Sequence, residues 1–257
     1  MMFKRVYTLL LLVVFCHFLP AQNKPTTGLN MDEGTTLNVL YKNEGSGQIY
    51  ANTRGFGALY RRGRHITAKT RSFYEIDFQT LKHPKEIKVT GSAQDKKRFV
   101  YGKLNSVCLF RAAVGMQKVL FAKADNKAVE VRYSYSIGPT LALAKPYYVQ
   151  VYRAQSAAGG PAVPDVVKFN SESFTQDSVV GRGAFSNGLA ELKIYPAVSA
   201  KFNLSFEYAP YTNLIRAIET GISLDYFPKA LPMMARNPTE NFIVTFHVGF
   251  VFGSKWY

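Results

Sequence analysis

The chain has 257 residues, of which 47% are hydrophobic and 19% charged, and its formal net charge is +15. This length suffices for one medium domain or one small membrane barrel, but it is too short for the roughly 16–18 strands of a porin channel. With two cysteines, Cys16 and Cys108, the composition does not indicate a disulfide-stapled fold.

Residues 1–21 have the pattern of a secretory signal peptide. A positive start precedes an apolar stretch of fourteen residues, too short to span a bilayer as a helix, and Ala21 completes a cleavage site. A lipoprotein signal that uses Cys16 is an alternative that Phe15 disfavours, because a small residue is wanted there. A retained anchor is a further alternative, which the length disfavours. Cleavage after Ala21 would leave 30 basic and 17 acidic residues, a net charge of +13, and Cys108 as a small apolar residue in a strand.

Beyond an extended polar lead-in at 22–45, the hydrophobic pattern has a period of two. In VEVRYSYSIGPTLALA, residues 129–144, one parity carries valine, tyrosine, isoleucine and leucine, and the other carries charged residues, serine, glycine and alanine. This alternation is typical of a strand with one apolar face. We predict eight strands, at about 47–61, 69–80, 100–115, 128–145, 147–153, 193–209, 214–227 and 241–253.

A soluble β-sandwich would also alternate, but three features favour a membrane barrel. The apolar faces are longer than soluble strands of ~5–6 residues allow. The polar faces are rich in small residues, as a narrow barrel interior requires. Aromatic residues gather near strand ends, where the girdles of membrane barrels lie. Lipid cannot form hydrogen bonds with the unpaired backbone groups of an open sheet edge. We therefore predict an all-β fold, a transmembrane antiparallel β-barrel formed by residues 46–257.

An even number of strands predicts that both ends of the barrel lie in the periplasm. The predicted external connections are RRGRHITAK (61–69), QKVLFAKADNK (117–127), the long loop 154–192 and FPKALPMMARNPTE (227–240). The predicted periplasmic connections are LKHPKEIKVTGSAQDKKR (81–98), AKP (144–146) and APYTN (209–213).

The last eighteen residues, ENFIVTFHVGFVFGSKWY, combine strict alternation with an aromatic end. Phe242 and Val244 begin an apolar row predicted to face lipid, while His247 faces the lumen. The pattern resembles the C-terminal recognition signal that the barrel-assembly machinery reads in outer-membrane barrels. The residues that would carry this signal are Phe246, Val248, Phe250, Phe252, Trp256 and Tyr257. The alternative is a buried strand of a soluble β protein.

Ten polar residues are predicted to face the lumen: Glu75, Asp77, Arg111, Glu130, Arg132, Lys201, Glu207, Glu219, Asp225 and His247. Paired carboxylates are able to perform acid–base catalysis when their environments separate their pKa values. In a barrel this narrow, however, buried charges must pair with one another. No catalytic triad order, metal-ligand spacing or phosphate-binding glycine loop stands out. We therefore expect a polar network without enzyme activity, cofactor or metal.

The most distinctive polar stretch is YRRGRHITAKTR. Its predicted site residues are Arg61, Arg62, Arg64, His65, Lys69 and Arg71. In an exported protein such a cluster does not indicate nucleic-acid binding. Next to an aromatic girdle, it favours contact with lipid phosphates or with an acidic protein surface. The alternative is a solvated loop of ordinary positive charge.

Several stretches resemble a family of small outer-membrane β-barrel proteins of Bacteroidota. They are GFGALYRRGRHITAKTRSFYEIDF, LKHPKEIKV, FVYGKLNSV, ELKIYPAVSAKFNLSFEY and the aromatic end. The resemblance covers most of residues 46–257. It implies a location in the bacterial outer membrane and a barrel fold, but no activity.

Three functional hypotheses follow. By analogy with small barrels in assembly and type IX secretion complexes, the first is a non-enzymatic accessory subunit of such a machine. The second is a stand-alone structural barrel that binds lipid A phosphates. The third is an outer-membrane enzyme acting on lipids. The expected partners are outer-membrane lipids including lipopolysaccharide, the barrel-assembly machinery and other outer-membrane proteins.

Overall fold

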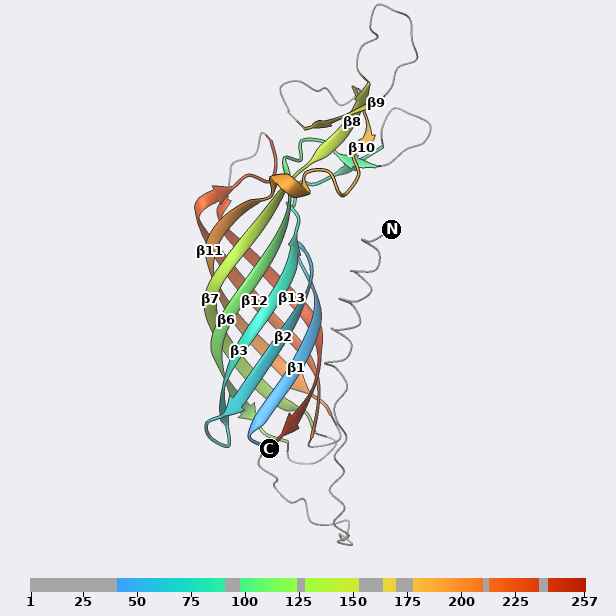
Figure 1. The fold of residues 1–257 in the computed structure, drawn as a ribbon. Coiled ribbons are helices and arrows are strands. Elements are labelled where there is room, and N and C mark those ends of the chain that lie inside the picture. Colours follow the sequence, from blue (N-terminus) through green and yellow to red (C-terminus); the bar gives the residue numbers. More distant parts are fainter. Residues whose placement is uncertain are drawn as a thin grey trace, which may run out of the picture. The chain divides into compact units, whose positions relative to one another are not determined.

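Eight antiparallel strands close into a barrel in the computed structural model (Figure 1). The barrel strands are β1 (Asn43–Asn52), β2 (Gly55–His65), β3 (Thr70–Leu81), β6 (Asn105–Phe121), β7 (Glu130–Pro146), β11 (Lys193–Glu207), β12 (Leu214–Leu231) and β13 (Glu240–Trp256). Their order around the barrel is β1-β13-β12-β11-β7-β6-β3-β2. The first and last strands close it by pairing, with Ile49 opposite Phe250. The predicted fold class, an antiparallel barrel of eight strands, is confirmed.

The structure describes residues 41–90, 98–123, 128–152, 164–169, 178–209, 213–235 and 240–257. Two units are separate in the chain, Met1–Asn38 and Val39–Tyr257, and the barrel belongs to the second. The predicted signal peptide and most of the predicted lead-in lie outside the described residues. Within the described ranges, no helix is long and apolar enough to cross a bilayer.

Two of the predicted strands were wrong. The segment 47–61 is a hairpin of β1 and β2 rather than one strand, and its turn is held by a hydrogen bond from the Arg54 amide to Asn52 Oδ1 at 2.8 Å. An asparagine side chain that accepts from the backbone two residues on is a turn-forming arrangement. The segment 147–153 lies outside the barrel as β8 (Tyr148–Tyr152). The two errors cancel, so the strand count was correct although the assignments were not.

Two small sheets accompany the barrel. β8 lies between β9 (Pro164–Lys168) and β10 (Val179–Arg182), and β4 (Lys88–Val89) pairs with β5 (Phe99–Val100). A short 3-10 turn, η2 (Leu189–Glu191), precedes β11. A buried apolar cluster connects the two sheets: Phe99, Tyr147, Val149, Val151, Phe169 and Val179. The connections between barrel strands therefore have a core of their own.

The revised strand order changes the topology. One end, called the terminal end, carries Asn43, Trp256 and the strand ends that flank 66–69, 122–129 and 208–213. The opposite end, called the long-loop end, carries the strand ends that flank 53–54, 82–104, 147–192 and 232–239.

Four predicted connections are therefore on the wrong side. The strands that flank 61–69 and 117–127 place them at the terminal end, not beside the loop 154–192. Those that flank 81–98 and 144–146 place them at the long-loop end. The physical reason is the missed β1–β2 turn. The chain reverses there once more than predicted, so every later connection moves to the opposite end, until the wrongly predicted strand at 147–153 restores the order.

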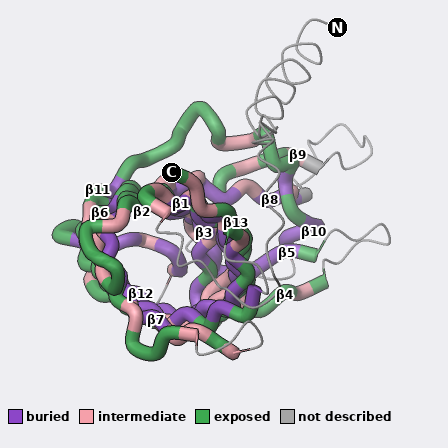
Figure 2. Tube along the Cα trace, turned by 90° about the horizontal axis from the view of Figure 1, so that it is seen from below, coloured by how far each residue is buried: buried purple, intermediate pink, exposed green. Residues whose placement is uncertain are grey.

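The barrel is apolar outside and polar inside. Buried and exposed positions alternate along the strands (Figure 2). In β13, the predicted outward row of Phe242, Val244, Phe246, Val248, Phe250 and Phe252 is 44% to 60% exposed, so its outward direction is confirmed. Cys108 in β6 is half-buried on the same outer face. This inside-out distribution is what a barrel surrounded by lipid requires.

The interior is itself divided along the barrel. At the long-loop end it is filled by an apolar cluster: Leu81, Val100, Val107, Leu109, Ala142, Ala144, Tyr195, Ala197, Phe227, Leu231, Met233, Met234 and Ile243. From the middle to the terminal end, charged and polar side chains replace this apolar packing. The long-loop end is therefore closed by hydrophobic packing, and the remainder by polar contacts.

Candidate functional site

The middle of the barrel holds a network of ion pairs, called the central network. Its members are Arg61, Glu75, Asp77, Arg111, Lys201, Glu219 and Asp225. Arg61 donates through Nε and Nη2 to Glu75 Oε2 at 3.1 and 3.0 Å. The same guanidinium donates through Nη1 and Nη2 to the two oxygens of Glu219, at 2.9 and 3.1 Å. One side chain of β2 thus connects carboxylates on β3 and β12.

Arg111 of β6 makes an equivalent connection between carboxylates on β3 and β12. Its Nε and Nη2 donate to the oxygens of Asp225 at 2.9 and 2.7 Å, and its Nη1 donates to Asp77 Oδ2 at 2.8 Å. Lys201 joins the ion pairs of Arg61 to those of Arg111, because its Nζ lies 2.6 Å from Asp77 Oδ2 and 3.5 Å from Glu75 Oε1. Forked guanidinium–carboxylate pairs of this kind are strong and geometrically specific.

A second set of charges, called the terminal network, fills the interior at the terminal end. Its members are Glu44, Arg71, Lys123, Glu130, Arg132, Glu207 and Lys255. Glu207 is the hub: its carboxylate lies 2.5 Å from Arg132, 3.0 Å from Lys255 and 3.5 Å from Lys123. Glu44 pairs with Arg71 and, at 3.8 Å, with Arg132.

The two networks balance in charge. The central network has three basic and four acidic members, and the terminal network has four basic and three acidic members. Within the described residues these fourteen groups pair with one another, as charges removed from water must. The interior is therefore nearly neutral, and the positive excess of the chain lies outside it.

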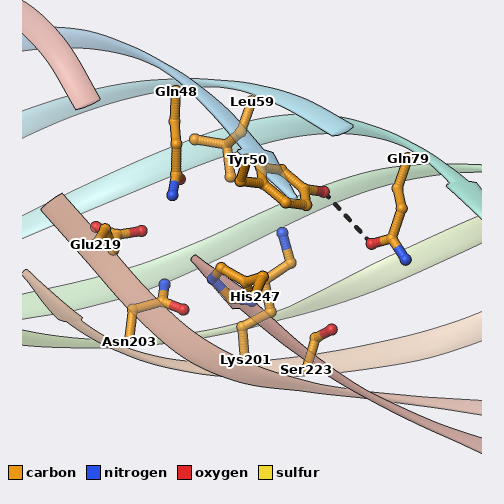
Figure 3. Close-up of a pocket in the computed structure, with 9 residues that line it drawn as sticks. All are labelled: Gln48, Tyr50, Leu59, Gln79, Lys201, Asn203, Glu219, Ser223 and His247. Carbon is orange, nitrogen blue, oxygen red and sulfur yellow. Dashed lines mark hydrogen bonds between the residues drawn. The ribbon is translucent and has the colours of Figure 1, made fainter. Parts of the chain in front are cut away.

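The cavity beside the central network is small. A cavity of about 10 Å³ beside the central network is lined by Tyr50, Lys201, His247 and their neighbours, which point toward one another in Figure 3. Glycines make room for Tyr50, because a Cβ at Gly57 would lie 2.5 Å from its ring and one at Gly249 would lie 2.4 Å from its own Cβ. A volume near ~10–15 Å³ fits about one water molecule, whereas ligand pockets occupy ~300 Å³ or more. This interior space does not accommodate a substrate.

The ten predicted lumen residues all lie in these interior networks or beside them. Nine of them are members of the central or the terminal network, although Glu130 is only partly buried at the terminal end. His247 packs against Tyr50, with ring centroids 5.3 Å apart. Among the described residues, no group of three or more His, Cys, Asp or Glu side chains has the arrangement of a metal site. The arrangement serves to neutralise charge.

The predicted basic cluster does not form one surface. Arg61 and Arg71 are 4% and 3% exposed inside the barrel, and His65 points inward to within 4.0 Å of Glu44. Arg62 and Arg64 are exposed on the outer face, and Lys69 lies exposed in the turn between β2 and β3. The prediction of lipid-phosphate contact was thus wrong for Arg61, His65 and Arg71. The reason is that β2 continues to His65, so the period of two also governs the arginines.

The outer face at the terminal end keeps four basic residues, called the terminal rim: Arg62, Arg64, Lys118 and Arg216. The Arg62 guanidinium lies over the Trp256 ring, 5.7 Å from its centroid. In the part of the chain that the structure describes, no carboxylate pairs with these four residues.

The predicted C-terminal signal residues lie at the seam of the barrel. Phe246, Val248, Phe250 and Phe252 point outward from β13, which pairs with β1. The Trp256 ring covers Gly45, and the Tyr257 carbonyl accepts a hydrogen bond from Asn43 Nδ2 at 3.0 Å. Their role as an assembly signal stays a prediction.

The interior face of β1 was not predicted from the sequence. Glu44 belongs to the terminal network, and the Tyr50 hydroxyl donates to Asp77 Oδ1 at 2.5 Å. Gln79 of β3 accepts from Arg111 Nη1 at 2.7 Å. The alternation of Glu44 and Tyr50 with outward positions is present in the sequence, but glycines at 45 and 47 remove the apolar half of the pattern.

The His-Pro-Lys-Glu segment forms a closed turn at the long-loop end. The Lys85 amide donates to His83 Nδ1 at 3.1 Å, and the His83 amide donates to Glu86 Oε1 at 3.2 Å. The Glu86 carboxylate also pairs with Lys103 at 2.7 Å. Burial lowers the pKa of His83 below its usual value, and the nearby charge of Glu240 opposes this shift. The imidazole is thus neutral and accepts a hydrogen bond from the backbone.

No protein-family model matches the sequence, and no curated protein matches it. Among solved structures, the chain is similar to Neisserial surface protein A, with a TM-score of 0.41 and 10% identity over 84% of this chain and 97% of that one. It is also similar to Ail, the attachment invasion locus protein of Yersinia pestis, with a TM-score of 0.39 and 6% identity over 84% of this chain and 100% of that one.

A second Ail structure, in complex with the heparin analogue sucrose octasulfate, gives a TM-score of 0.39 and 7% identity, again over 84% of this chain and 100% of that one. Because all three TM-scores are below 0.5, the fold assignment rests on the strand pairing of this chain itself.

Proposed function

We propose that the protein is an integral barrel of the bacterial outer membrane that neither catalyses a reaction nor conducts solutes. The observation that carries this proposal is the contrast between the charged inner face and the apolar outer face of the barrel. Asp77 and Asp225 are 0% exposed inside, whereas Phe246 and Phe250 are 55% and 56% exposed outside. Each barrel strand has at least 10 residues, which matches the ~9–11 needed to cross a bilayer.

The proposed orientation follows from the connections. Short turns and both ends of the barrel are typical of the periplasmic side, and long loops are typical of the cell surface. The terminal end therefore faces the periplasm, and the long-loop end faces outward. A cleaved signal peptide at 1–21 is part of this proposal, since it supplies the route of export.

Within this location, we propose that the protein is an accessory subunit of an outer-membrane assembly or secretion complex. Its ion-paired interior supports a role at the surface of the barrel, because the cavity beside the central network has room for about one water molecule. The β10-β8-β9 sheet supports a partner contact, since β9 pairs with β8 alone among the described residues, and an unpaired sheet edge readily pairs with another chain. Other outer-membrane proteins are the proposed partners, and the barrel-assembly machinery is the proposed partner during biogenesis.

A second candidate function is a stand-alone barrel that binds lipid phosphates. The terminal rim favours it, because Arg62 and Arg64 lie outward beside Trp256 without a carboxylate partner among the described residues. Basic residues near an aromatic girdle attract anionic headgroups. Outer-membrane lipids with anionic headgroups, at this rim those of the periplasmic leaflet, are the proposed ligands.

Extraction in mild detergent followed by affinity purification and mass spectrometry separates these candidates. Stoichiometric recovery of other outer-membrane proteins is expected for the accessory subunit, whereas a monodisperse monomer with bound lipid would contradict it in favour of the second function. A planar bilayer recording is expected to show no conductance. Release of fatty acid from labelled lipids by the purified barrel would contradict the non-enzymatic proposal.

A further inference from the structure

A basic pocket lies at the long-loop end, where four parts of the chain meet. It has a volume of about 270 Å³. Six of its side chains are cationic: Lys82, Lys88, Arg98, Lys103, Lys145 and Arg182. Its one acidic lining residue is Glu86. The charge excess in this pocket contrasts with the balanced interior of the barrel.

Most cations of the pocket have no carboxylate partner among the described residues. Glu86 is engaged by Lys103 at 2.7 Å, and Lys145 Nζ donates to the Phe185 carbonyl at 2.6 Å while lying 4.0 Å from the centroid of its ring. In the described part of the chain, Lys82, Lys88, Arg98 and Arg182 form no ion pair with a carboxylate. Arg182, Lys103 and Lys145 line the same pocket. Cations brought together in this way repel one another, and an anion between them would remove that repulsion.

Two lining residues of the pocket lie on the outer face of the barrel rim. Lys145 of β7 pairs in register with Ser106 of β6, and both have the outward parity of Cys108 and Leu143, the next outward pair. The outward side chains of the same strands further along are apolar. In a membrane, this rim lies where the lipid headgroups meet the hydrocarbon region.

We infer that this pocket binds phosphate monoester groups, and that their source is the headgroup of a phosphorylated lipid in the surrounding leaflet. Two guanidinium groups supply forked hydrogen bonds to phosphate oxygens, and the lysines supply compact positive charges. The lipid source rests on the proposed membrane location, whereas phosphate binding by the pocket does not. A soluble phosphorylated compound would present the same chemistry to the pocket.

The first arm of the test uses the full barrel in neutral detergent, with inorganic pyrophosphate as the probe in calorimetric titration. One variant combines Lys82→Gln, Lys88→Gln, Arg98→Gln and Arg182→Gln. The matched control combines Lys42→Gln, Lys168→Gln, Lys193→Gln and Lys229→Gln, which removes the same charge from exposed side chains that do not line the pocket. Heat-modifiable gel mobility verifies that both variants are folded.

We expect the pocket variant to bind pyrophosphate at least tenfold more weakly than the wild type, and the control to change less than twofold. The wild-type affinity is also expected to fall with added salt, because the contact is electrostatic. Equal affinities of the two variants for pyrophosphate would overturn the site. Binding of pyrophosphate by a protein found in the periplasm rather than the membrane would overturn the proposed location alone.

The second arm identifies the source. Wild-type protein is placed in phosphatidylcholine nanodiscs with and without lipid A, and pyrophosphate is titrated into both. We expect lipid A to suppress pyrophosphate binding, because its phosphates occupy the pocket from the membrane. Undiminished pyrophosphate binding in lipid A nanodiscs would overturn the lipid source and leave a site for soluble phosphorylated compounds.

Discussion

Arg61 and Arg62 are neighbours in the chain, yet they belong to different regions of the molecule. Arg61 is buried in the central network between Glu75 and Glu219, while Arg62 lies on the outer face beside Trp256. The inner face of the barrel is therefore stabilised by paired charges, and the outer face presents apolar side chains with basic residues only near its rim. In a closed barrel, the parity of a residue in its strand determines its physical role more than its chemical type does.

The sharpest test of this comparison changes the two arginines in turn. Arg61→Gln removes a cation that connects two carboxylates of 1% exposure. Loss of one partner from a buried ion pair costs about 3–5 kcal/mol, and we expect this decrease in the free energy of unfolding, measured by urea titration with gel mobility as readout. Arg62→Gln is expected to stay within about 0.5 kcal/mol of wild type. Equal costs for both changes would contradict the division into two faces.

A charge placed on the outer face tests the other half of the comparison, the apolar outer face. Phe246→Arg would direct a guanidinium from the middle of β13 into lipid, which costs about 2–4 kcal/mol at the midplane. We expect less folded barrel in the membrane fraction, while Phe246→Leu, which keeps the position apolar, retains the wild-type amount. Thr245 is the inward neighbour, where its hydroxyl lies 2.5 Å from that of Ser223, so an arginine there would be opposed by crowding instead. Equal tolerance of arginine and leucine at 246 would mean that this face does not contact lipid.

The smallest expected effect lies outside the barrel strands, at the turn formed by His83. Its pKa is lowered in the fold, so the folded state binds fewer protons there than the unfolded state. The stabilisation is therefore complete above the unfolded pKa of about 6.5 and is lost as pH falls below it. We expect the protection factor of the Lys85 amide to decrease between about pH 7 and pH 5, because protonated His83 cannot accept its hydrogen bond.

His83→Asn is the control for this turn. The amide oxygen of asparagine accepts a hydrogen bond without titrating, so the protection of the Lys85 amide should become independent of pH. A pH dependence that survives in His83→Asn would assign the effect to another group.

The sequence predicted the faces of the long strands because both halves of the alternation are visible there. In β7 and β13, large apolar residues occupy one parity and polar or small residues the other. The first strand, β1, lacks the apolar half of this alternation, because its outward positions 45 and 47 are glycines. At Gly45 a Cβ would lie 2.9 Å from the ring of Trp256, a residue from the far end of the chain. Tertiary contacts of this kind cover the face without leaving a local signal.

The central network was predictable as a set of inward charges, but its partners were not. Arg111 reaches Asp225, 114 residues away, because closure of the barrel brings β6 and β12 across the same interior. The basic pocket also depends on tertiary structure, since β10 contributes Arg182 and the β3–β6 connection contributes Lys82. The sequence shows how many charged side chains are present. Which of them pair depends on the order of the strands and on which loops meet at the same end of the barrel.

The central claim is a lipid-embedded barrel with its long-loop end outside the cell, and cysteine labelling tests it most directly. In a Cys108→Ser background, Ser186→Cys lies at the exposed long-loop end, Thr67→Cys in the exposed turn at the terminal end, and Phe250→Cys on the outer face. An impermeant maleimide on intact cells should label only Ser186→Cys. Permeabilised cells should add Thr67→Cys, and Phe250→Cys should react only after denaturation. Labelling of Thr67→Cys but not Ser186→Cys on intact cells would contradict the orientation, and ready labelling of Phe250→Cys in the native protein would contradict the membrane barrel.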